Sequence, residues 1–208
     1  MYLNLALIIA SYFIGAIPFG YMAGKLKGID IRLHGSGNIG STNVFRIVGK
    51  KAGITVQVLD ILKGVAPVVA GRMLNLPPHI LVISGIAAVC GHNWPIYLKF
   101  KGGKGVNTSL GVVAGLMPWI AIMCFAVWAA AFLAFRYVSL GSIAAAVAFP
   151  ILVFAFNQSP VFKILSLIMG VFVVIRHRSN IKRLLSGTEN KFGTKKKTNK
   201  AADGTETP

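Results

Sequence analysis

Acidic residues are the scarcest chemical group in this 208-residue chain, which contains 5 Asp and Glu residues against 22 Lys and Arg residues. Charged side chains of either sign make up only 13% of the sequence, whereas 55% of the residues are hydrophobic and the mean hydropathy is +0.69. This composition excludes an ordinary soluble domain and indicates a protein that crosses a membrane several times. The net charge of +17 does not call for nucleic acid, because the basic residues gather in short segments between apolar runs, as in cytoplasmic loops.

Cysteine and histidine are also rare. Cys90 and Cys124 both fall within apolar runs, so we expect buried thiols and no disulfide framework. The four histidines are scattered along the chain and have few acids near them. We therefore expect neither a metal site nor a cofactor.

The apolar runs predict an all-α, polytopic membrane protein with seven transmembrane helices. They cover residues 3–24, 52–74, 79–91, 143–156 and 161–175, together with the 30-residue run 106–135, which we divide at residues 115–118. At 1.5 Å per residue that run would measure about 45 Å, which exceeds one hydrocarbon core of roughly 30 Å. Basic residues precede and follow it, and two crossings keep both groups inside. The N-terminus is then expected outside and the C-terminus in the cytoplasm.

A single integral-membrane domain is expected over residues 1–187. Residues 188–208 are rich in Lys, Thr and Gly without apolar periodicity, which predicts a basic, disordered cytoplasmic tail. No basic residue precedes the first apolar run, so we expect it to remain as a helix and not to be removed as a signal peptide.

Two charged residues lie inside the second apolar run. Asp60 and Lys63 are three residues apart, a spacing that brings both side chains to one face of a helix. Because intramembrane charges usually pair with one another, we favour a structural ion pair over a catalytic role. His92 is expected to be a hydrogen-bonding residue of the core or of a helix end.

Three polar segments interrupt the apolar runs, and all are expected on the cytoplasmic side. They are residues 35–46 (GSGNIGSTNVFR), 91–105 (GHNWPIYLKFKGGKG) and 176–183 (RHRSNIKR). The first combines flexible glycines, hydroxyl and amide donors and the guanidinium of Arg46, although it could also be a loop that only caps two helices. The second places Lys104 and backbone N–H groups before a helix, which suits phosphate without forming a Walker A loop. Together they predict an anion site at the membrane surface.

The role of His177, in the third segment, stays open at this point. Its imidazole could act as a base or donate a hydrogen bond to phosphate, and it could equally be an interfacial side chain beside two arginines.

In order and spacing, these segments closely resemble the bacterial acyl-phosphate:glycerol-3-phosphate acyltransferase family, PlsY, over residues 1–192. The resemblance implies an enzyme of the bacterial inner membrane, multi-pass, with its active site at the cytoplasmic face. Such an enzyme transfers a fatty acyl group from acyl phosphate to the 1-hydroxyl of glycerol 3-phosphate and yields lysophosphatidic acid and phosphate. Its partners would be those two substrates and the lipid bilayer, without nucleic acid or an obligatory protein partner.

The resemblance also implies roles for individual residues. The expected catalytic residues are Ser36, Arg46, Lys104, His177 and Asn180. The expected substrate-binding residues are Gly37, Asn38, Gly40, Ser41, Thr42, Asn43, Gly102, Gly103, Gly105 and Ser142, the last at the end of a short inner loop at residues 136–142. Glu189 is expected to be a structural acid that neutralises part of the positive cluster. The proton acceptor is either His177 or the phosphate of the acyl donor.

Two other classes fit the residues less well. A transporter or channel for a phosphorylated solute could also have seven helices and intramembrane charges, and inverted internal repeats, which are not visible here, would favour it. A non-catalytic binder of anionic lipid could use the basic segments alone.

Overall fold

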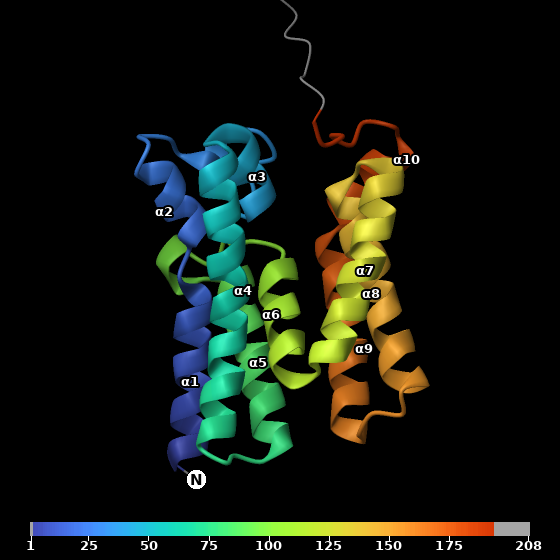
Figure 1. Ribbon diagram of the computed structural model, residues 1–208. Helices are drawn as coiled ribbons and strands as arrows, with labels where there is room; N and C mark the ends of the chain where they lie inside the picture. The colour runs from blue at the N-terminus through green and yellow to red at the C-terminus, as the bar shows by residue number, and fades with distance from the viewer. Residues whose placement is uncertain (1, 194–208) are drawn as a thin grey trace, which may run out of the picture.

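The computed structural model describes residues 2–193, and within that range the chain forms helices and no strand. The long helices stand side by side in two groups (Figure 1). The N-terminal group consists of α1 (Tyr2–Ala16), α2 (Phe19–Lys25), α3 (Ser41–Ile47), α4 (Lys50–Met73), α5 (Pro78–Asn93) and α6 (Val106–Leu116). The C-terminal group consists of α7 (Pro118–Phe135), α8 (Val138–Ala155), α9 (Pro160–Arg176) and α10 (Arg178–Leu185).

The predicted division of the long apolar run is confirmed. Met117 separates α6 from α7, and Pro118 opens α7 at a position where its missing N–H costs no hydrogen bond. Helix α6 contains only 11 residues, a length of about 16 Å, so it is too short to cross a hydrocarbon core alone.

Seven full-length spans are therefore not confirmed. Within residues 2–193, five helices are long and apolar enough to cross a membrane, counting α1 and α2 as one, or six if α9 and α10 form one bent span. These candidate spans lie where the apolar runs predict them. The prediction exceeds this number because α6 is too short to count as a span, and because the last predicted span, 161–175, counts only if α9 and α10 are taken together.

The first span is broken near its middle. Helix α1 ends at Ala16, and Pro18 precedes α2. The break frees the carbonyl of Ile17 from helical bonding, and this carbonyl accepts a hydrogen bond of 2.9 Å from Nζ of Lys63 on α4. A polar backbone group exposed by a helix break is thus satisfied by a neighbouring helix, as a membrane interior requires.

Helices α4 and α6 pack with their backbones in contact. A Cβ atom on Gly64 would lie 2.2 Å from the carbonyl oxygen of Thr108, and one on Gly111 would lie 2.0 Å from that of Ile61. Glycines at such points allow two helices to approach closely where lipid offers no hydrophobic driving force. This contact fixes the relative height of the residues on α4 and α6 that face the site.

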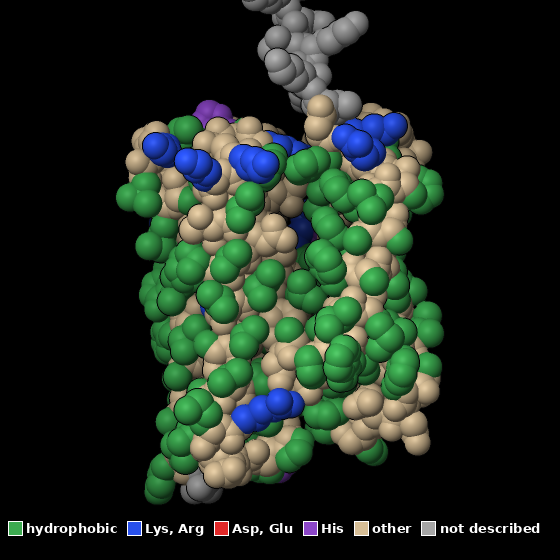
Figure 2. Space-filling model, viewed as in Figure 1, with side chains coloured by type: hydrophobic (Ala, Val, Ile, Leu, Met, Phe, Trp, Pro, Cys, Tyr) green, Lys and Arg blue, Asp and Glu red, His purple; other side chains and the backbone are tan. Residues whose placement is uncertain are grey.

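Most of the lysine and arginine side chains visible in Figure 2 gather at one end of the molecule, where α3 and α10 lie, whereas the flanks are mainly apolar. We call this the basic end; it includes Lys25, Lys50 and Lys182. A further basic group lies near the opposite end (Figure 2). Residues 186–193, which we call the C-terminal strap, cross the basic end from the C-terminal group towards the N-terminal group. Within the strap, the ring of Phe192 lies 5.0 Å from that of Phe45 and 5.4 Å from that of Phe132.

The C-terminal strap extends across residue 187, where the membrane domain is predicted to end and the tail to begin. Residues 188–193, expected in the tail, lie against the two helix groups: the N–H of Phe192 donates to the carbonyl of Arg136 at 2.8 Å, and Arg46 donates to the carbonyl of Asn190 at 3.3 Å. Residues 194–208 lie outside the described residues, so the prediction of a disordered tail remains a prediction there.

Candidate active site

A cavity of about 350 Å³ lies between the two groups of helices and is visible as a hollow in the flank of the molecule (Figure 2). Its polar lining consists of Ser36, Asn38, Ser41, Thr42, Asn43, Arg46, Gln57, Asp60, His92, Lys104, Asn107, Ser109, Ser139, Ser142, His177, Asn180, Arg183, Glu189 and Asn190. Its apolar lining includes Leu110 and Val113 of α6, Phe125, Trp128 and Phe132 of α7, Phe149 of α8 and Met169 of α9. The cavity therefore joins a polar end to an apolar arm.

Glu189 is the centre of the polar end. Its Oε1 atom accepts hydrogen bonds from Asn180 Nδ2 at 2.7 Å and from Ser139 Oγ at 2.8 Å, and its Oε2 atom accepts from Arg183 Nε at 2.6 Å. Burial alone would raise the pKa of the Glu189 carboxyl, but these three donors lower it below its usual value. The carboxylate is ionised and its oxygens are committed to protein partners.

Lys104 is joined to this centre through Asn180, whose Oδ1 atom accepts a hydrogen bond from the lysine Nζ. Burial lowers the pKa of Lys104 to about 8, and the charge of Glu189 opposes that shift. Three arginine charges lower the pKa further: Arg183, Arg176 and Arg46. Lys104 can therefore change its protonation state close to neutral pH, and a bound phosphate would favour the charged form.

The first polar segment is shaped by two asparagines. Asn43 accepts a hydrogen bond from the N–H of Ser36 at 3.0 Å and donates to the carbonyls of Ile31 and His34 at 3.2 and 3.0 Å. Asn38 accepts from the N–H of Gly40 at 2.8 Å. Both amides hold the loop that presents Ser36 to the cavity, so this segment is a built wall of the site rather than a simple connection.

The second half of this segment lies in helix α3, Ser41–Ile47. The helix carries Arg46 to the mouth of the cavity, beneath the C-terminal strap. Burial lowers the pKa of the Arg46 guanidinium from its ordinary value, while the charge of Glu189 acts in the opposite direction. A guanidinium keeps its charge under such a shift, so Arg46 remains a cation at neutral pH.

The glycines of the second segment are arranged differently from what the sequence indicates. The N–H groups of Gly102 and Gly103 donate to the carbonyls of Asn93 and His92 at 3.2 and 3.1 Å, so they point to protein acceptors instead of the cavity. A Cβ on Gly103 would lie 2.0 Å from Nε2 of His92. Close packing therefore explains Gly103, and Gly105, with φ +80°, makes the left-handed turn into α6.

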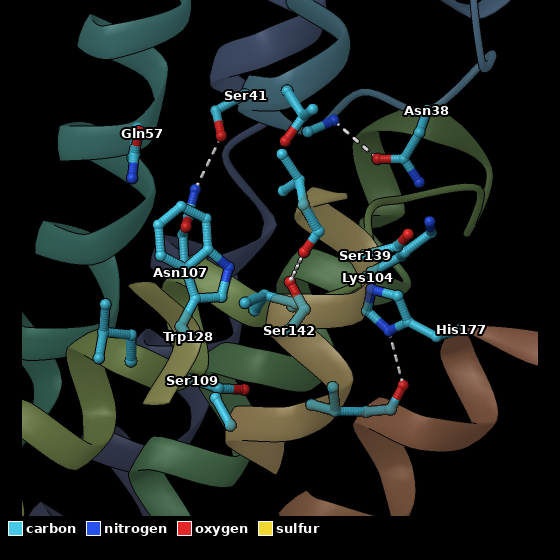
Figure 3. Close-up of a pocket in the computed structure, with 18 of the residues that line it drawn as sticks. Asn38, Ser41, Gln57, Lys104, Asn107, Ser109, Trp128, Ser139, Ser142 and His177 are labelled. Atoms are coloured by element: carbon cyan, nitrogen blue, oxygen red, sulfur yellow. Dashed lines mark hydrogen bonds between the residues drawn. The ribbon is translucent and has the colours of Figure 1, made fainter. Parts of the chain in front are cut away.

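The third segment places His177 at the bend between α9 and α10, where its side chain is buried. The Nδ1 atom lies 2.8 Å from the carbonyl of Val173, an acceptor, so Nδ1 carries a proton. In the neutral ring, the Nε2 atom then carries no proton and can accept a hydrogen bond. Figure 3 shows His177 and Lys104 on the same side of the cavity.

Ser142 differs from its predicted setting. It lies in the second turn of α8, which begins at Val138, so residues 138–142 are helical and do not form a loop. The helix begins after Tyr137, whose backbone is extended, and it continues through Gly141, where a Cβ atom would lie 2.9 Å from the carbonyl oxygen of Trp128 on α7. The hydroxyl of Ser142 donates to the carbonyl of Val138 at 2.9 Å and still faces the cavity (Figure 3).

All but three of the expected site residues line the cavity. The three that do not are Gly37, Gly102 and Gly103. Other residues of the site were not predicted: Ser139 and Arg183, which bind Glu189, and Gln57 and Asn107, which face the cavity from α4 and α6. Ser139 and Arg183 each stand three residues from an expected site residue on the same helix, a signal that could have identified them.

The apolar arm has an aromatic wall on α7. The rings of Trp128 and Phe132 are stacked with centroids 5.0 Å apart, and those of Phe125 and Trp128 with centroids 5.8 Å apart. These residues recur at helical spacing and cover one face of α7. A flexible alkyl chain fits such a surface, which offers contact area and no hydrogen-bonding requirement.

The predicted ion pair in the membrane interior is confirmed. Nζ of Lys63 lies 2.8 Å from Oδ1 of Asp60, and both side chains are only 3% exposed. Nδ1 of His92 lies 3.6 Å from the same oxygen. Of the two thiols expected to be buried, Cys124 is buried and Cys90 is half-buried.

Comparison with known proteins gives a consistent result. A family model described as glycerol-3-phosphate acyltransferase matches residues 5–187. A glycerol-3-phosphate acyltransferase of a Thermoanaerobacter species is 48% identical over 196 residues, covering 94% of this chain and 98% of the relative. One from Geotalea daltonii is 45% identical over 189 residues, covering 91% of this chain and 97% of the relative.

Two solved structures are also similar to this chain. The crystal structure of PlsY (YgiH), an integral membrane glycerol 3-phosphate acyltransferase, in its glycerol 3-phosphate form superimposes with a TM-score of 0.88 at 44% identity, covering 92% of this chain and 96% of that one. The lysophosphatidic acid form of that enzyme superimposes with a TM-score of 0.85 at 43% identity.

Proposed function

This chain belongs to the glycerol-3-phosphate acyltransferase family and is an integral membrane enzyme, and we propose that its acyl donor is acyl phosphate. The proposed reaction transfers the fatty acyl group to the 1-hydroxyl of glycerol 3-phosphate and yields lysophosphatidic acid and phosphate. The site would lie at the cytoplasmic face of a bacterial inner membrane, where the basic end of the molecule would be placed by the excess of cytoplasmic lysine and arginine in membrane proteins.

One observation carries this proposal: the cavity combines several cations with a long apolar arm in one continuous space. Lys104, Arg46 and Arg183 gather around the polar end, which suits two phosphate groups better than one. The arm suits the alkyl chain of the donor. An acyl phosphate presents both features in one molecule, whereas glycerol 3-phosphate needs only the polar end.

The chemistry requires a group that takes the proton from the attacking hydroxyl. The oxygen of that hydroxyl bonds to the acyl carbon, the bond from that carbon to the phosphate oxygen breaks, and phosphate leaves with the electron pair. Both acids of the described cavity lining are committed, Asp60 to Lys63 and Glu189 to its three donors. We therefore assign the proton to the departing phosphate of the donor, with the cations steadying its charge.

His177 then has a positioning role towards phosphate instead of acting as the base. Its Nδ1–H stays on the carbonyl of Val173, and a phosphate beside Nε2 would favour the doubly protonated ring, which donates its Nε2–H to that phosphate. Exchange of His177 for Gln or Asn should keep measurable turnover on this assignment, because an amide can still donate a hydrogen bond. A positioned general base typically contributes about 10²–10⁴-fold, so a loss of that size together with loss of the acidic limb of the pH profile would assign the base to His177.

The donor is tested with purified protein in detergent. Labelled glycerol 3-phosphate is mixed separately with acyl phosphate, with acyl-coenzyme A and with acyl carrier protein, and lysolipid and phosphate are both measured. We expect lysolipid only with acyl phosphate and in a one-to-one ratio with released phosphate. Turnover with either thioester donor would overturn the proposal.

A further inference from the structure

The cavity has a second polar wall, opposite the one built around Glu189. It is formed by Ser41 of α3, Gln57 of α4 and Asn107 of α6, and Figure 3 shows these side chains together on the side of the cavity away from Lys104 and His177. We refer to these three residues as the amide wall. None of them carries a charge.

The backbone contact between α4 and α6 places two of these residues at nearly the same height. Ile61 of α4 touches Gly111 of α6, and both helices run away from the basic end. Gln57 and Asn107 each precede those contact residues by four positions, one helical turn. Their amides therefore project from neighbouring parallel helices into the same part of the cavity.

The amide wall retains unused hydrogen bonds. Asn107 donates one N–H to Oγ of Ser41 at 2.9 Å, which leaves its second N–H and the hydroxyl proton of Ser41 available. Gln57 makes no hydrogen bond to any residue in the range 2–193 and is partly exposed to the cavity. An uncommitted amide within a membrane-spanning helix is costly unless it meets a ligand or water.

The position of the wall indicates which part of a ligand meets it. Along α6, the polar lining residues Asn107 and Ser109 are followed by the apolar residues Leu110 and Val113, so the lining changes from polar to apolar within two turns. Lys104 comes three residues before Asn107. Suppose that the donor binds with its phosphate at Lys104 and its alkyl chain in the apolar arm. The atoms that join the phosphate to the chain then lie beside the amide wall. In an acyl phosphate, those atoms are the carbonyl group.

We propose that Gln57 and Asn107, with Ser41, bind the carbonyl oxygen of the acyl group. This inference rests on the proposed function, since it assumes that an acyl chain enters the arm. When the glycerol hydroxyl attacks, the π electrons of the carbonyl move to its oxygen, and they return as the bond to phosphate breaks and phosphate takes the proton. N–H and O–H donors placed at that oxygen stabilise the charge as it develops.

The test compares two ligands that differ only at the carbonyl. Purified protein is titrated with 1-acyl-glycerol 3-phosphate, an ester, and with the 1-alkyl ether of the same chain length, and the dissociation constants are measured. A neutral hydrogen bond should make wild-type protein prefer the ester by about threefold to tenfold. Gln57→Met, which keeps the size but not the amide, should reduce that preference towards unity and leave ether binding unchanged.

The matched control is Thr55→Val, which removes a polar group from the exposed face of α4 and should leave both affinities unchanged. Gln57→Asn, which keeps an amide on a shorter side chain, should give an intermediate preference. An unchanged preference in Gln57→Met would overturn the proposal. Equal weakening of ester and ether would also overturn it, and would assign the amide to a glycerol hydroxyl.

Turnover gives a second, independent readout. Gln57→Met should lower kcat with acyl phosphate by about tenfold, and Gln57→Glu should lower it further because its carboxylate repels the developing oxyanion. The KM for glycerol 3-phosphate should change less than twofold in both variants; a selective rise in that KM would contradict the assignment. If wild-type protein does not use acyl phosphate at all, the proposed donor is wrong, while the ester and ether titration still tests the amide wall.

Discussion

Asp60 and Glu189 are both acids of the cavity lining with side chains only 3% and 7% exposed, yet they acquire their partners in opposite ways. The main partner of Asp60 is Lys63, one turn away on the same helix. The partners of Glu189 come from α8 and α10, and Glu189 itself lies in the C-terminal strap. A pair within one helix can form as soon as that helix does, whereas the Glu189 centre exists only when three segments meet. We therefore expect the Asp60–Lys63 pair to contribute mainly to the stability of the fold, and the contacts of Glu189 to contribute mainly to activity.

The largest effect is expected at the local pair. Asp60→Ala would leave the buried charge of Lys63 without its counter-ion, which should cost about 3–5 kcal/mol of stability. The measurement is the thermal unfolding midpoint in detergent. Adding Lys63→Met to Asp60→Ala should restore most of the loss, and a double variant no more stable than the single one would show that the charge pair is not the cause.

Glu189→Gln should affect activity more than stability. The neutral side chain can accept from Asn180 but presents an N–H group towards Arg183, so the chain of contacts to Lys104 loosens. Loss of charged hydrogen bonds worth about 1.5–3 kcal/mol corresponds to a fall in kcat/KM of roughly tenfold to a hundredfold. Parallel measurements of kcat/KM and of the unfolding midpoint decide the matter: an unfolding shift as large as that of Asp60→Ala would remove the distinction between the two acids.

The protonation of Lys104 provides a smaller effect that depends on pH. With its pKa at about 8, Lys104 loses its proton in the free enzyme as pH rises through that value. Phosphate favours the charged form, so the KM for acyl phosphate, whose phosphate we place at Lys104, should rise by about tenfold per pH unit above pH 8. Lys104→Arg stays charged and should have a flat profile up to pH 10.

The same profile tests the link to Glu189. The charge of Glu189 raises the pKa of Lys104, and Glu189→Gln removes that charge. The rise of KM with pH should therefore begin at a lower pH in this variant. A rise that begins at the same pH would show that the two side chains are electrostatically independent.

The smallest effect is expected at Ser139. Ser139→Ala removes one of the two hydrogen bonds to Oε1 of Glu189 and should lower kcat/KM by about twofold to tenfold, as for a hydrogen bond of about 0.5–1.5 kcal/mol. Ser166→Ala is the matched control, because Ser166 is also buried but donates within α9 to the carbonyl of Lys163. Equal effects of the two changes would indicate that loss of a buried hydroxyl is enough and that Glu189 is not involved.

Sequence reasoning succeeds where a property is local. Apolar runs place the candidate spans, Pro118 marks the break after α6, and a spacing of three residues is sufficient to pair Asp60 with Lys63. The same reasoning brings eleven of the expected site residues to one cavity through three recognisable polar segments, and Ser142 and Glu189, which lie outside those segments, line it as well.

It fails where the result depends on how helices meet. Whether the N–H groups of Gly102 and Gly103 face a ligand depends on where α5 ends, since carbonyls of His92 and Asn93 take them. Ser142 is helical because α8 begins sooner than the hydropathy pattern indicates. Helix α6 ends where the division is predicted, but its 11 residues are too few to span. The amide wall has no motif at all, because Gln57 and Asn107 become neighbours only through the contact of α4 with α6.

The position of Glu189 in the C-terminal strap has a consequence for the order of events during synthesis. Chains are made from the N-terminus and fold in that direction, so α1 to α9 precede the strap into place. At that stage the apolar arm is complete on α6, α7 and α8, but Asn180 lacks the carboxylate that orients it towards Lys104. The growing polypeptide would thus be able to bind an alkyl chain before it could catalyse acyl transfer. The placement of Glu189 would then convert a lipid-binding intermediate into an enzyme.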